Sequence, residues 1–150
     1  MYNRILLTTD GSDNSKAAIK HALQIASDEN AELVILHVVD RKHLTNIREE
    51  HYGKINSIEE YSKIVLDDFE KAVKEVESEM EEHNEVKITK IARGGKPCDV
   101  IVKLCEEENI DMIVISNSGK HKLDRFLLGS VTERIIRDSP VPVYVIPANY

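Results

Sequence analysis

Apolar residues follow two alternating patterns along the chain. Short runs that are nearly all apolar, or that alternate apolar with polar residues, are typical of strands in a buried sheet. Longer stretches with apolar residues at helical spacing are typical of amphipathic helices. The expected strands cover residues 4–8, 32–39, 86–92, 111–116 and 141–146, and the expected helices cover residues 13–30, 58–80, 97–108 and 130–137.

Strands and helices alternate throughout this pattern, and such an order predicts an α/β fold. We expect a five-stranded parallel sheet, doubly wound, with helices on both faces and right-handed crossovers. Residues 1–150 read as a single domain. In sheets of this kind, ligands bind at the carboxyl ends of the strands, which directs attention to the residues that follow each apolar run.

Composition limits the classes of partner. The chain is 41% hydrophobic and 31% charged, as folded globular proteins are. No apolar stretch approaches the ~18 residues of a membrane-spanning helix, and the short apolar run near the N-terminus is not a signal peptide, so we expect a cytoplasmic protein without a membrane contact. A formal net charge of −7 argues against nucleic acid as a partner, because lysine and arginine hold the phosphate backbone.

Cysteine and histidine give no sign of a metal or redox site. Cys98 and Cys105 lie on one predicted helix, about 10 Å apart along its axis, which is too far for a disulfide. We interpret them as small buried apolar side chains. The six histidines lack the spacing of zinc ligands, so we predict no metal site.

The segment SNSGKHKLDRFLLGSV, residues 116–131, connects a buried strand to a predicted helix. A helix amino terminus carries unpaired amides and a partial positive charge, so it attracts anions. Gly119 and Gly129 allow the backbone to approach such an anion closely, and Ser130 adds a hydroxyl donor. Basic side chains of the same segment add local positive charge; they are Lys120, His121, Lys122 and Arg125. These features favour a phosphate-binding loop.

This segment resembles the signature of the universal stress protein family of the ATP-binding type, G-x2-G-x9-G-[S/T]. Its second and third glycines correspond to Gly119 and Gly129, and its hydroxyl position corresponds to Ser130, while Ser116 replaces its first glycine. Four other segments are similar to the family: ILLTTDGSDNS, LHVVD, GGKPCDVIVKLCEEENIDMIVIS and LLGSVTERIIRDSPVPVYVIP. The resemblance implies a Rossmann-like sheet with strand order 3-2-1-4-5.

The resemblance also implies a role for individual residues. Asp10 and Thr9 would lie near a ribose, Ser116 would lie against it, the backbone of Val38 would contact the adenine edge, and Gly119, Gly129, Ser130 and the amide of Val131 would hold the phosphates. Simpler roles stay open. Asp10 could only cap the turn into the first helix, and the Cβ of Ser116 is tolerated only if its φ is negative.

A protein that binds ATP, ADP or AMP and acts as a nucleotide-dependent regulator in stress response is therefore expected, with Mg²⁺ or Mn²⁺ carried by the phosphates. Two alternatives remain: a slow ATP hydrolase, or a protein of the same fold that binds no nucleotide because of Ser116. We assign no catalytic residue, since Asp10 is the evident carboxylate near the phosphates and has no obvious partner. A phospho-accepting receiver domain would need an aspartate at the end of the third strand, where this chain has Ala92-Arg93-Gly94. A P-loop kinase would show GxxxxGK[ST] and a dinucleotide-binding protein would show GxGxxG, and the sequence contains neither motif.

The last predicted strand, Val141 to Ile146, contains Pro142, which lacks an amide donor and so favours the edge of the sheet. Unpaired backbone groups on an edge strand can be satisfied by a second copy of the chain across a two-fold axis. Family resemblance points the same way. We therefore predict a homodimer built on this strand.

Overall fold

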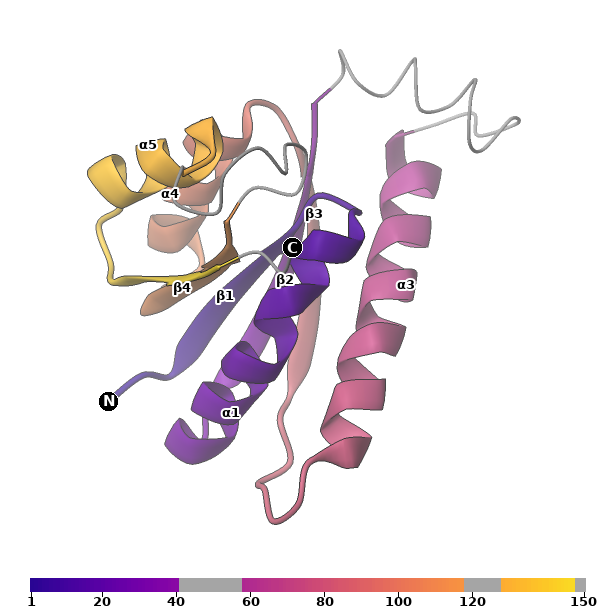
Figure 1. Ribbon diagram of the computed structural model, residues 1–150. Helices are drawn as coiled ribbons and strands as arrows, with labels where there is room; N and C mark the ends of the chain where they lie inside the picture. The colour runs from indigo at the N-terminus through magenta and orange to yellow at the C-terminus, as the bar shows by residue number, and fades with distance from the viewer. Residues whose placement is uncertain (41–57, 118–127, 148–150) are drawn as a thin grey trace.

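Five parallel strands form one sheet in the order β3-β2-β1-β4-β5 in the computed structural model, which describes residues 1–40, 58–117 and 128–147 (Figure 1). The strands are β1 (Arg4–Thr9), β2 (Glu32–Val39), β3 (Ile88–Gly94), β4 (Met112–Ser116) and β5 (Val143–Ile146). The helical elements are η1 (Asp13–Ala18), α1 (Ile19–Glu29), α3 (Ile58–Glu79), α4 (Pro97–Glu107) and α5 (Ser130–Asp138). The predicted fold class and strand order are confirmed.

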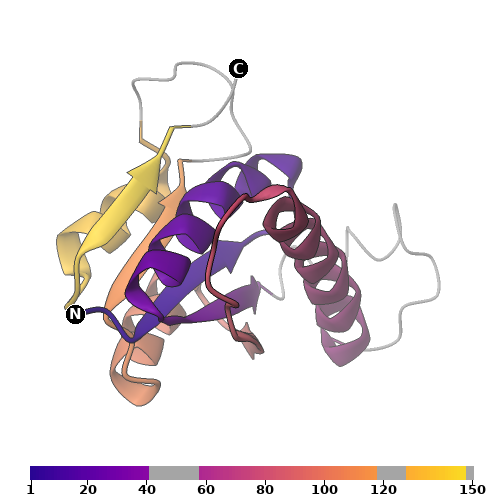
Figure 2. The same cartoon turned by 90° about the horizontal axis from the view of Figure 1, so that it is seen from below.

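Both faces of the sheet are buried, because successive side chains of a strand point to opposite faces. Ile5 and Leu7 belong to a core with α1 and α3, whereas Leu6 belongs to a second core with α4 and α5. Figure 2 shows the two helix layers on opposite sides of the sheet. This burial explains the nearly continuous apolar runs of β1, β2 and β4.

Several boundaries differ from those predicted. The first helix begins as a 3-10 helix, Asp13–Ala18, before it continues as α1. β3 lies two residues later than predicted, because its pairing with β2 continues as far as Gly94. β5 begins at Val143, since Pro142 has no amide; the Pro142 carbonyl still accepts a hydrogen bond from Ile113 N at 2.9 Å.

The two cysteines are free and buried, as predicted. Burial raises the pKa of the Cys105 thiol to about 11, so that it stays protonated. Within the described ranges, no helix combines the length and the apolar character that crossing a membrane requires.

Candidate functional site

The strand order changes direction between β1 and β4, because the chain first builds β2 and β3 on one side of β1 and then adds β4 and β5 on the other. Side chains and loops at the carboxyl ends of these two strands are the usual place for a ligand in an open α/β sheet. The amino end of α5 lies at the same edge of the sheet (Figure 1). The predicted site residues that the structure describes lie at or next to this edge.

β1 ends in a tight turn held by hydroxyl groups. The hydroxyl of Thr9 is buried, accepts a hydrogen bond from Gly11 N at 3.1 Å and lies 2.9 Å from the Ser15 hydroxyl. Gly11 has a φ of 85°, a conformation that favours glycine. Ser12 caps η1 by accepting a hydrogen bond from Ser15 N. The side chain of Thr9 therefore serves the turn.

Asp10 is exposed and its Oδ1 accepts hydrogen bonds from Ser12 N at 2.8 Å and from the Ser12 hydroxyl. This is the capping contact that the sequence left open as an alternative. It holds the carboxylate at the carboxyl end of β1, where the predicted ribose contact would also place it.

Val38 lies one position beyond the last paired residues of β1 and β2, which are Thr9 and His37. Glu32 N donates to Asn3 O, so the even-numbered residues of β2 direct their backbone groups toward β1. The Val38 carbonyl therefore points to the β1 side of β2, beyond the last residue of β1 that pairs with β2. Its half-buried side chain packs in the core beside α4 and α5.

Ser116 is the last residue of β4. In the part of the chain that the structure describes, the non-glycine residues with positive φ are Asn30 and Asn109. Ser116 therefore has a negative φ, and its Cβ causes no backbone strain at the position where the family signature has glycine.

α5 begins without a side-chain cap. Its N-cap is Gly129, with φ −64° and ψ 155°, and its first residue, Ser130, is exposed. Glu133 N donates to Gly129 O at 2.9 Å, which closes the first helical turn. The amides of Ser130, Val131 and Thr132 come before that bond and have no acceptor within the helix. These amides form a positive end of the helix that is available to an anion.

Asn117 and His37 belong to this region, although the sequence analysis did not single them out. Asn117 directly follows β4, is 4% exposed, and accepts a hydrogen bond from Gly129 N through its Oδ1 at 3.0 Å. The available signal in the sequence was an asparagine directly after an apolar strand. Gly119 and the basic residues Lys120, His121, Lys122 and Arg125 lie outside the described residues.

His37 is a buried neutral group of β2 rather than a charged ligand. Its Nδ1 lies 3.3 Å from the Ser62 hydroxyl, and its ring packs edge-on against Tyr61 at 5.5 Å between centroids. Burial lowers the pKa of His37 to about 4, while the nearby Asp10 partly opposes this shift. The imidazole therefore carries no charge near neutral pH.

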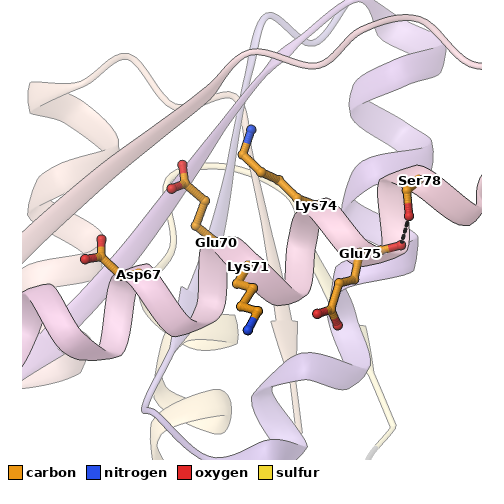
Figure 3. Close-up of a pocket in the computed structure, with 6 residues that line it drawn as sticks. All are labelled: Asp67, Glu70, Lys71, Lys74, Glu75 and Ser78. Atoms are coloured by element: carbon orange, nitrogen blue, oxygen red, sulfur yellow. Dashed lines mark hydrogen bonds between the residues drawn. The ribbon is translucent and has the colours of Figure 1, made fainter.

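Two surface hollows lie away from the amino end of α5. One, of about 440 Å³, lies on the outer side of α3 and is lined by charged side chains of that helix and Ser78; Figure 3 shows them projecting from one ribbon. The other, of about 290 Å³, lies between the β1 turn and α3, where Lys16 pairs with Asp68 at 3.3 Å. Neither hollow includes a residue of α5, but the second includes Thr9, a predicted site residue at the carboxyl end of β1.

Comparisons with known proteins agree along nearly the whole chain. Residues 1–147 match the universal stress protein family. Universal stress protein MJ0531 of Methanocaldococcus jannaschii is 37% identical over 146 residues, which are 97% of this chain and 82% of that protein. The structure of MJ0577, from the same organism, is 31% identical with a TM-score of 0.77 and covers 100% of this chain and 99% of its own. A universal stress protein solved in complex with cAMP is 25% identical, with a TM-score of 0.70 and coverage of 99% and 98%.

Proposed function

The chain belongs to the universal stress protein family, and on that basis we propose that it binds ATP or a shorter adenine nucleotide and acts as a nucleotide-dependent regulator in stress response. The observation that carries the proposal is the amino end of α5, where a glycine N-cap leaves the first amides without a side-chain cap at the edge where β1 and β4 end. The cAMP complex of a structurally similar protein supports an adenine ligand in the family.

The proposed nucleotide lies across the carboxyl ends of β2, β1 and β4. Its adenine contacts the Val38 backbone, and its ribose lies near Asp10, Thr9 and Ser116. Its phosphates meet the amino end of α5, at Gly129, Ser130 and the amide of Val131, together with Gly119. The predicted Mg²⁺ or Mn²⁺ would be held mainly by the phosphate oxygens.

We propose binding rather than rapid turnover. Hydrolysis needs a positioned water and usually a base beside it. Asp10 is the evident carboxylate near the proposed phosphates, and one of its oxygens already holds Ser12. The neutral His37 is 2% exposed, so it cannot reach a water at the γ-phosphate.

Thermal unfolding of the nucleotide-free protein tests the proposal. At ~100 times its dissociation constant, a ligand stabilises a fold by about 2.7 kcal/mol. At roughly 2–4 °C per kcal/mol for a domain of this size, ATP or AMP should raise the melting temperature by about 5–10 °C. GTP at the same concentration should raise it less. If no adenosine phosphate shifts the transition and calorimetry detects no binding heat, the proposal is wrong.

We also propose that two copies of the chain pair through β5. This strand is an edge of the sheet. Ile113 N donates to Pro142 O and Asn117 N donates to Ile146 O, so the even-numbered residues of β5 direct their backbone groups toward β4. The backbone groups of Val143 and Val145 therefore point outward, where a second copy can pair with them.

Replacing Val145 with proline should convert the proposed dimer to a monomer at micromolar concentration. Proline removes an outward-pointing amide and leaves the hydrogen bonds between β4 and β5 in place. Val145→Ala is the matched control, because it loses similar packing but keeps the amide. Light scattering should give about twice the chain mass for wild type and Val145→Ala. A monomeric wild type would contradict the proposed dimer.

A further inference from the structure

We infer that Asn117 is a positioning residue of the nucleotide site, which holds the amino end of α5 in place for the phosphates. This inference rests on the proposed function. It starts from one contact: the side chain of Asn117 accepts a hydrogen bond from Gly129 N at 3.0 Å, across twelve positions of the sequence.

Asn117 is itself attached to the sheet. Its backbone N donates to Ile146 O at 2.7 Å, one position beyond the last paired residues of β4 and β5, which are Ser116 and Ile146. Its side chain is buried, with 4% of the residue exposed. A hydrogen bond from such an anchor fixes Gly129 relative to the sheet, and Gly129 is where α5 begins.

The contact also decides which amides remain for a ligand. The first four amides of a helix have no acceptor inside it. Asn117 occupies the earliest of them, that of Gly129, and the next three, of Ser130, Val131 and Thr132, follow in the first turn of α5. Because the N-cap residue Gly129 has no side chain, it cannot cap these amides. Asn117 thus orients the helix end without covering it.

The neutral amide suits this task better than a carboxylate. Since the donor is a backbone N–H, the contact uses only the oxygen of the Asn117 side chain. Aspartate has the same shape and could accept the same bond. It would, however, place a buried negative charge against Gly129, next to the amide of Ser130 that is proposed to meet the phosphates. Asparagine provides the acceptor without that repulsion.

The test compares the affinity of each variant for ATP with its affinity for adenosine, which lacks phosphates. Asn117→Ala should weaken ATP binding by about tenfold, the usual effect of losing one buried hydrogen bond, and should leave adenosine affinity within about twofold. Asn117→Asp keeps the shape of the side chain and so protects the fold. It should weaken ATP binding by more than Asn117→Ala does, again with adenosine unaffected.

Asn84→Ala is the matched control. In the wild type, the side-chain amide of Asn84 donates to Ser27 O at 2.8 Å and so joins α1 to the segment before β3. Val86, in the same segment, belongs to the core with α1 and α3. The control should change neither affinity. If the Asn117 variants lose ATP and adenosine affinity equally, or lose neither, the positioning role is wrong while the proposed function stands. If the wild type binds adenosine but no adenosine phosphate, or binds neither, the proposed function and this inference are both overturned.

Discussion

Gly129→Asp should remove most of the thermal stabilisation by ATP and should slightly stabilise the protein without ligand. Gly129 already has the extended backbone of an N-cap, with φ −64° and ψ 155°. Ser12, which caps η1 through its side chain, has nearly the same conformation, with φ −84° and ψ 158°. An aspartate at position 129 can therefore cap α5 without backbone strain, and its charge favours the positive helix end. Together these effects should stabilise the unliganded fold by about 0.5 kcal/mol.

The same carboxylate occupies the amides that the phosphates need and repels their charge. ATP affinity should fall by roughly 100-fold, as expected when a charged group loses its hydrogen-bonded partners. Urea unfolding measures the gain in stability, and thermal unfolding with and without ATP measures the loss of binding. Opposite signs in one variant separate a blocked site from a damaged fold.

Gly94→Asp is the matched control. Gly94 ends β3, its φ is not positive, and a Cβ there would meet only Val39 O at an ordinary 3.8 Å. This variant adds the same charge to the same edge of the sheet, but at a different strand. It should keep most of the ATP shift. A Gly129→Asp protein that ATP still stabilises as strongly as wild type would place the phosphates elsewhere.

The sheet could be predicted because its buried strands consist almost entirely of apolar residues. β2, for example, has apolar residues at nearly every position, which only a strand covered on both faces requires. The start of α5 was equally readable, since a glycine and a serine precede an amphipathic segment. Edge strands were harder. β3 is mostly exposed, so its alternation of apolar and polar residues did not show where its pairing with β2 begins.

The contacts that hold the candidate site together could not be read from the sequence. Asn117 meets Gly129 only because β4 and α5 are brought side by side, and nothing in the local pattern specifies that bond. His37 looked like one more residue of an apolar run. Its neighbours Tyr61 and Ser62 come from α3, more than twenty positions later in the chain. Polar contacts between distant elements follow from tertiary packing.

His37 should make the protein less stable as the pH falls from about 6.5 to 4. In the unfolded chain its imidazole takes up a proton with an ordinary pKa of about 6.5, whereas burial lowers the pKa of His37 in the fold to about 4. Below pH 6.5 the unfolded chain therefore binds a proton that the folded chain does not. The resulting loss grows to about 3 kcal/mol by pH 4, and it is negligible above pH 7.

Urea unfolding at pH 7 and pH 5 isolates this contribution in the variant His37→Gln, which removes the titrating ring. Between these two values the His37 contribution to wild type should amount to about 2 kcal/mol. The variant will be less stable at pH 7, because it loses the packing against Tyr61, but its stability should depend less on pH by that amount. The exposed His21, replaced by glutamine, serves as the control for the loss of an imidazole outside the core. Equal pH dependence in His37→Gln and wild type would mean that His37 can take up its proton inside the fold, and the imidazole beside Tyr61 and Ser62 would then have to be accessible to water.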